Sequence, residues 1–291
     1  MRYLLFLASI LLITLVSMCA GLPEVPFFNT GDGSIQKAGV IIMDTESPDV
    51  FIRAEAIPPT EVRSGRNVNV YFELRNKNTY SLKNVKLTVY DPCIFSGDVE
   101  KLITEIKANK TYTFSLKWTA GNVDLDTDCK VKFRIEYDAE YSLFQNIAVL
   151  SQSEYEQRAL SGTLQDIPVQ SFFPDSPLRI SLSFSETQPF MNNEKYYLQL
   201  DYRNVGGGVV NVDSGAITIK PPANVKDFSC ADYGGSLTNS KALNFISNRA
   251  STSSCSFTTS TAQTMDIMSL VVSARYKYML DNSILIKVKR V

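Results

Sequence analysis

The side chains that perform most enzyme chemistry are sparse in this chain. Its 291 residues include no histidine. This excludes serine–histidine and cysteine–histidine nucleophile systems, histidine metal sites and the usual proton shuttle near neutral pH. Acidic and basic side chains balance at 30 against 29, so the basic excess typical of nucleic-acid-binding proteins is missing. We therefore expect a protein that is not an enzyme, uses no cofactor and binds no nucleic acid.

Cysteine is the most informative reactive residue type in the sequence. Four of the five cysteines lie beyond the N-terminal segment, at Cys93, Cys129, Cys230 and Cys255, and four cysteines allow three pairings. We predict the bridges Cys93–Cys129 and Cys230–Cys255, because each lies within one half of the chain. Four free buried thiols are the alternative. A zinc site of four thiolates is disfavoured, because no two cysteines have the C-x-x-C spacing.

The first 20 residues have the pattern of an export signal. Arg2 precedes a run of mostly apolar residues that ends at Met18, as in secretory signals. The next residue, Cys19, resembles the lipidated cysteine of prokaryotic lipoproteins, although Met18 stands where their lipobox has Gly, Ala or Ser. Ordinary cleavage near Ala20 and an uncleaved anchor are the alternatives. In each case we expect the following chain to be extracytoplasmic, in a compartment that permits disulfides.

Two further motifs are candidates for ligand binding or modification. The carboxylates of Asp124, Asp126 and Asp128 alternate along the chain, and such a turn can surround a hard cation such as Ca²⁺. The glycine and glutamate that an EF-hand requires at later positions are absent, and a solvated acidic turn is the competing interpretation. Asn109 begins the sequon Asn-Lys-Thr for N-glycosylation.

The elements that must position these residues are short β-strands. Apolar and polar residues alternate through 67–76, 85–90, 111–118 and 131–137, which is the period of a half-buried strand. The predicted inward sets are Val68, Val70, Phe72 and Leu74; Val85, Leu87 and Val89; Tyr112, Phe114 and Leu116; and Val131, Phe133 and Ile135. About seven such strands with frequent turns predict an antiparallel β-sandwich.

The second half of the chain repeats this plan. Phe72–Asn76 parallels Leu200–Asn204, and Phe133–Tyr137 parallels Val272–Tyr276. Residues 227–261 read as an elaborated loop. The predicted organisation is a signal over 1–20, a flexible tether over 21–47, sandwich domains over 48–151 and 176–291, and a linker with a short helix over 152–175.

Residues 72–91 (FELRNKNTYSLKNVKLTVYD) and 200–219 (LDYRNVGGGVVNVDSGAITI) resemble the CARDB-type, cell-adhesion-related β-sandwich modules of prokaryotic surface proteins. The shared features are an asparagine after a strand, often a glycine, and then an alternating apolar strand. The resemblance implies an Ig-like fold and an extracytoplasmic location in an archaeon or bacterium. It carries over no functional residues.

Taken together, the sequence predicts an all-β protein with two tandem Ig-like antiparallel β-sandwich domains after an N-terminal signal or anchor. We expect an envelope-tethered protein with a structural or adhesion role. The alternative is an accessory binding subunit or ligand receptor of a surface assembly. Such a protein would use sandwich edges, by β-augmentation, or the 227–261 loop. The expected partners are the membrane, through the anchor, and other envelope or surface proteins, or glycans.

Overall fold

The structure is a computed structural model that describes residues 43–58, 61–260 and 263–291. The predicted signal, the lipidation candidate Cys19 and most of the predicted tether lie outside these residues. The last tether residues form strand β1 (Met43–Glu46). The described residues all belong to one compact unit.

The fold is all-β, as the alternation predicts, and its strands form three sheets. Sheet A has the order β1, β2 (Val50–Ile57), β4 (Asn67–Asn76), β8 (Thr111–Ala120) and β6 (Phe95–Gly97). Sheet C has the order β11 (Leu178–Phe184), β13 (Lys195–Asn204), β17 (Ser253–Thr259) and β16 (Val225–Cys230). Sheet B has the order β14 (Val209–Asn211), β18 (Met265–Lys289), β9 (Thr127–Leu150), β5 (Leu82–Asp91) and β7 (Glu100–Ile106). Four short strands also pair with β9 or β18: β3 (Val62–Arg63), β10 (Ser171–Phe172), β12 (Phe190–Met191) and β15 (Ile217–Lys220).

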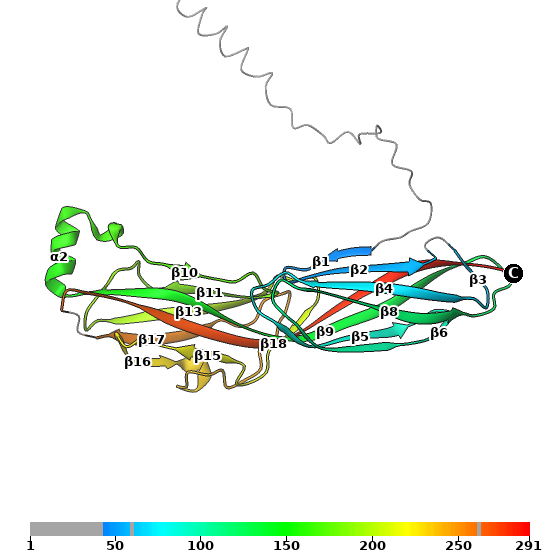
Figure 1. The fold of residues 1–291 in the computed structure, drawn as a ribbon. Helices are drawn as coiled ribbons and strands as arrows, with labels where there is room; N and C mark the ends of the chain where they lie inside the picture. Colours follow the sequence, from blue (N-terminus) through cyan, green and yellow to red (C-terminus); the bar gives the residue numbers. More distant parts are fainter. Residues whose placement is uncertain (1–42, 59–60, 261–262) are drawn as a thin grey trace, which may run out of the picture. The chain divides into compact units, whose positions relative to one another are not determined.

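Two long strands, β9 and β18, run through both halves of the fold (Figure 1). They pair antiparallel along all 24 residues of β9, from Thr127 opposite Val288 to Leu150 opposite Met265, without a register shift. At about 3.4 Å per residue this two-stranded ribbon is about 80 Å long. Sheet A packs on its first half, where Phe72 and Phe133 meet edge to face at 5.2 Å. In the second half, Phe190 of β12 packs against Phe257 of sheet C at 5.8 Å.

The predicted boundary at 152–175 does not separate the two halves. The sequence predicts separate strands over 269–278 and 284–288, both in the second domain, but these residues form the single strand β18. Its end, residues 279–288, pairs with 127–136 in the first half. The alternation of buried residues continues through Leu280, Ile284 and Ile286 with no Pro or Gly to interrupt the strand.

The predicted linker also does more than connect the halves. Its predicted helical turns form α2 (Gln152–Ser161), which begins at the N-cap Ser151 and ends at Gly162, a residue with φ of 71° that suits glycine. The short 3-10 helix η2 (Leu164–Asp166) follows. This segment folds back on the end of β9, where Ile167 joins Ala148 and Leu150 in a small separate core.

The repeat seen in the sequence is also structural. Strands β4 and β13 share one pattern of burial, and each ends at an asparagine. Asn76 accepts from the N–H of Asn78 at 3.0 Å and donates to the carbonyl of Tyr80 at 2.7 Å. Asn204 makes the same two bonds, to Gly206 at 3.1 Å and Gly208 at 2.8 Å. Each side chain thereby replaces backbone partners in the turn that follows, which explains why both strands end in asparagine.

Candidate functional site

The middle of the β9–β18 ribbon is where the two repeats meet. Tyr137 and Tyr276 end the matched segments, and the residues that follow them, Asp138 and Lys277, are direct partners across the ribbon. An antiparallel pairing of equivalent residues places an approximate two-fold axis at that pair. Alternation along the strands directs Asp138 and Lys277 outward and the two tyrosines into the interior.

A polar hollow of about 770 Å³ lies on the outer face at this axis. Its charged lining consists of the three cations Lys83, Arg275 and Lys277 and the four acids Glu105, Asp138, Glu140 and Asp213. The amide of Asn84 donates to Asp138 at 2.8 Å, and Arg275 donates to the carbonyl of Gly215 at 2.9 Å. Cationic hydrogen-bond donors and anionic acceptors therefore converge here. Such a lining suits a ligand rich in hydroxyl or mixed polar groups.

At the same position, the inner face of the ribbon carries a buried cluster of tyrosines around Asp49. The hydroxyl of Tyr137 donates to the carboxylate of Asp49, which is fully buried. Burial raises the pKa of Asp49, and the hydrogen bond from Tyr137 opposes that rise. Tyr276 is held by hydroxyls from both halves, Tyr80 at 3.1 Å and Ser176 at 2.9 Å. Burial also raises the pKa of Tyr276 well above its usual value, so it stays protonated and joins the halves by hydrogen bonding.

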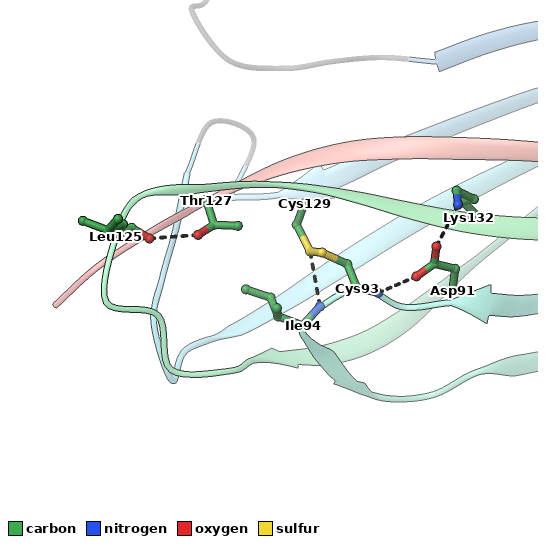
Figure 2. Close-up of a disulfide and its surroundings, with 7 residues drawn as sticks. All are labelled: Asp91, Cys93, Ile94, Leu125, Thr127, Cys129 and Lys132. Atoms are coloured by element: carbon green, nitrogen blue, oxygen red, sulfur yellow. Dashed lines mark hydrogen bonds and ion pairs between the residues drawn. A yellow bond between two sulfur atoms is a disulfide. The ribbon is translucent and has the colours of Figure 1, made fainter.

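Both predicted disulfides are confirmed. Cys93–Cys129 joins the turn after β5 to the start of β9, beside an ion pair of 2.9 Å between Asp91 and Lys132 (Figure 2). Cys230–Cys255 joins paired residues of β16 and β17. The alternatives of free thiols and a thiolate zinc site are therefore wrong. Two disulfides indicate an oxidising, extracytoplasmic environment.

The predicted acidic triplet does not form a cation site. Asp126 accepts from Lys289 at 3.0 Å and from the N–H of Arg290 at 3.2 Å, and the hydrogen bond from Lys289 lowers its pKa. Asp128 lies in β9 opposite Lys287, and Asp124 lies in the preceding bend. In the described part of the chain, no group of three or more acidic or cysteine side chains could hold a metal ion. The calcium prediction is therefore corrected: Asp126 fastens the end of the chain to the first half.

Two other predicted sites lie on the surface. Asn109 is exposed in the turn between β7 and β8, where its φ is 55° and its N–H donates to Asn78 at 3.1 Å. The region 227–261 includes the end of β16, the 3-10 helix η3 (Ala231–Tyr233) and β17. Its loop is held against β15, because the amide of Asn239 accepts from Ile217 and donates to Asp213, both at 2.8 Å. A second hollow, of about 550 Å³, borders this loop.

Sequence reasoning missed the hollow at the centre of the ribbon. Its lining comes from five separate parts of the chain: Glu105 and the segments 81–84, 138–140, 213–216 and 275–277. The only local signal is that charged residues follow the matched tyrosines in both repeats. Such charges also occur on ordinary solvated strand faces, so the pattern alone does not identify a site.

Comparison with known proteins identifies no family. No family model matches the chain, and no curated protein matches it. Among solved structures, the search returned one described as "Structure of infectious bursal disease virus Gx strain". It has 10% sequence identity and a TM-score of 0.11, and covers 83% of this chain and 74% of that chain. A TM-score this low carries no argument about fold or function. Within the described residues, no helix is long and apolar enough to cross a membrane.

Proposed function

We propose that this protein is a non-catalytic, envelope-tethered extracytoplasmic protein with a structural or adhesion role. The observation that carries the proposal is the β9–β18 ribbon, whose 24 paired positions join both halves without a break in register. Backbone hydrogen bonds along about 80 Å resist bending, which is what a spacer that presents a surface at a distance requires. The two disulfides further support a role outside the cytoplasm.

Within this proposal, the two halves are Ig-like, CARDB-type sandwiches that share sheet B. Residues 1–20 supply the anchor, through lipidation of Cys19 or an uncleaved signal, and ordinary cleavage would instead release the chain. The tether then holds the rigid unit away from the membrane surface. This arrangement uses the N-terminus for attachment and leaves both sandwich halves accessible to envelope proteins or glycans.

Surface location can be tested on intact source cells. Protease added outside the cells should release fragments of 48–291, and the full chain should sediment with membranes. Cys19→Ala should release it into the soluble fraction if lipid is the anchor, while the matched control Ser17→Ala should leave it bound. Protection of 48–291 in intact cells, with cleavage only after lysis, would contradict the proposal.

A second candidate function is an accessory binding subunit or ligand receptor, and the central hollow favours it. Cations and acids converge there in about 770 Å³, a size that suits a small polar ligand such as an oligosaccharide. Binding to an immobilised oligosaccharide panel should be lost in Lys277→Ala and retained in Lys287→Ala, an exposed lysine on the same strand. Equal binding by both variants would remove this candidate.

A further inference from the structure

Sheet A is incomplete along one side of strand β8. On its inner side β8 pairs with β4 from Thr111 to Thr119, but β6 covers its outer side only at residues 118–120. Asp98 occupies the next position, where it bonds to the N–H and carbonyl of Lys117 at 3.1 and 3.2 Å. From Thr111 to Leu116, β8 has no strand on its outer side among the described residues. We call residues 111–115 the β8 notch.

The backbone groups of the β8 notch are free to pair. The N–H of Asn76 donates to the carbonyl of Lys110, and the N–H of Ala120 donates to the carbonyl of Arg66, each at 2.9 Å. These bonds show that the backbone N–H and carbonyl groups of the even-numbered residues of β8 point toward β4. Antiparallel geometry therefore points the N–H and carbonyl groups of the odd-numbered notch residues outward. Those residues, Thr111, Thr113 and Ser115, are all exposed, and no partner for these groups lies in the described part of the chain.

The notch also lacks the devices that usually protect a sheet edge. Natural edge strands carry charges, bulges or covering segments. Strand β7 has Glu100, Lys101 and Glu105, and β16 has a register shift after Lys226. The notch reads Thr-Tyr-Thr-Phe-Ser, without charge, proline or bulge. The inward ring of Tyr112 remains 37% exposed, because the sandwich is open at this edge.

We propose that a second copy of this chain docks in the notch, β8 against β8, antiparallel about a two-fold axis at Thr113. The notch sequence is its own complement in this register. Thr111 faces the partner's Ser115, Tyr112 faces the partner's Phe114, and Thr113 faces the partner's Thr113. Hydroxyl pairs and aromatic pairs are cross-strand combinations that stabilise sheets, and a two-fold contact of this kind closes on itself.

The ends of the notch fit the same arrangement. In this register Lys110 of each copy lies opposite the partner's Leu116, and the partner's Asp98 occupies the next position along its β8. The chain leaves sheet A at 107–110. It therefore does not occupy the space that the partner's β6 would need at this end of the notch. The contact is small, so the dimer should be weak and concentration-dependent. This inference does not depend on the proposed location or role.

Sedimentation velocity of the full chain in mild detergent, over a concentration series, tests the docking. We expect reversible dimers in the wild type. Thr113→Lys, which places two lysines opposite each other at the axis, should weaken dimerisation by at least about 10-fold. The matched control Ser181→Lys puts the same charge on exposed β11 of the second half and should dimerise like the wild type. Unchanged circular dichroism and thermal midpoints will show that both variants are folded.

Three results would overturn the proposal: a monomer at every concentration, dimerisation that Thr113→Lys leaves unchanged, or equal weakening by Thr113→Lys and Ser181→Lys. An independent arm uses Thr113→Cys. Directly opposed residues in an antiparallel pair have Cα atoms about 5.5 Å apart, which a disulfide can bridge. Mild oxidation should therefore give a covalent dimer for Thr113→Cys and none for Ser181→Cys, and the reverse pattern would also count against the notch.

Discussion

The shared ribbon predicts that a defect in one half of the protein destabilises the other. Leu200 lies in β13 of the second half and is fully buried. Trp118 is the only tryptophan in the chain and lies in the first half, 2% exposed, with its indole N–H bonded to the carbonyl of Asp98 at 2.6 Å. Because β9 and β18 belong to both cores, Leu200→Ala should lower the unfolding midpoint that Trp118 fluorescence reports.

The size of the effect follows from the burial of Leu200. Replacing a buried leucine by alanine costs about 2–5 kcal/mol, from lost transfer free energy and the cavity left behind. For a unit of this size each kcal/mol lowers the thermal midpoint by about 2–4 °C. We therefore expect the fluorescence of Trp118 and the far-ultraviolet circular dichroism to shift together, by roughly 4–20 °C.

The assay is thermal unfolding followed by both signals on the same samples. Leu160→Ala is the matched control, because this leucine of α2 is 91% exposed and its loss should change the free energy of unfolding by less than about 0.5 kcal/mol. Independent halves would behave differently. A Trp118 midpoint that stays at the wild-type value, together with a two-step dichroism curve, would refute the coupling through the ribbon.

Three other perturbations have definite expected outcomes. Replacing Cys93 and Cys129 by serine opens a loop with a sequence separation of 36 and should lower the free energy of urea unfolding by about 4 kcal/mol on the loop-entropy model; an unchanged urea midpoint would contradict this. Burial raises the pKa of Asp49 above its usual value, so its stabilising contribution is complete below the unfolded pKa and is lost as pH rises through the folded one. Asp49→Asn stays neutral, so its stability relative to wild type should increase between pH 4 and pH 8 in urea titrations, and a constant difference would argue against the assignment. A methyl group at Gly208 would overlap the backbone of β18, whereas Gly207 has open space; Gly208→Ala should therefore cost about 1–3 kcal/mol and Gly207→Ala much less, as thermal midpoints can show.

Much of the local structure was predictable from the alternation of residues. The predicted inward residues of β4, β5 and β9 are buried, because period two in a strand directs alternate side chains to one face. The inward set of β8 is confirmed less completely, since burial falls from Leu116 through Phe114 to Tyr112. That gradient reflects the open edge of sheet A, and no property of β8 alone reveals whether another strand lies beside it.

The continuous ribbon was not predictable in the same way. Asp281 and Asn282 fall between the two predicted strands, 269–278 and 284–288, yet they lie within β18. Asp281 is on the outer face and forms an ion pair of 2.6 Å with Arg134 of β9, a residue far away in the sequence. A polar pair in phase with the strand is compatible with either a turn or a continuous strand, and the partner strand decides between them.

The sequence by itself determined the fold class, the inward faces of the strands and a disulfide pairing confined to each half. These features depend on side-chain type and near-neighbour spacing. Only the tertiary structure decided which strands pair, that β9 and β18 serve both halves, and where the central hollow and the β8 notch lie. The physical reason is that every residue except proline offers the same backbone N–H and carbonyl groups, so alternation specifies which face is buried but not which strand lies alongside.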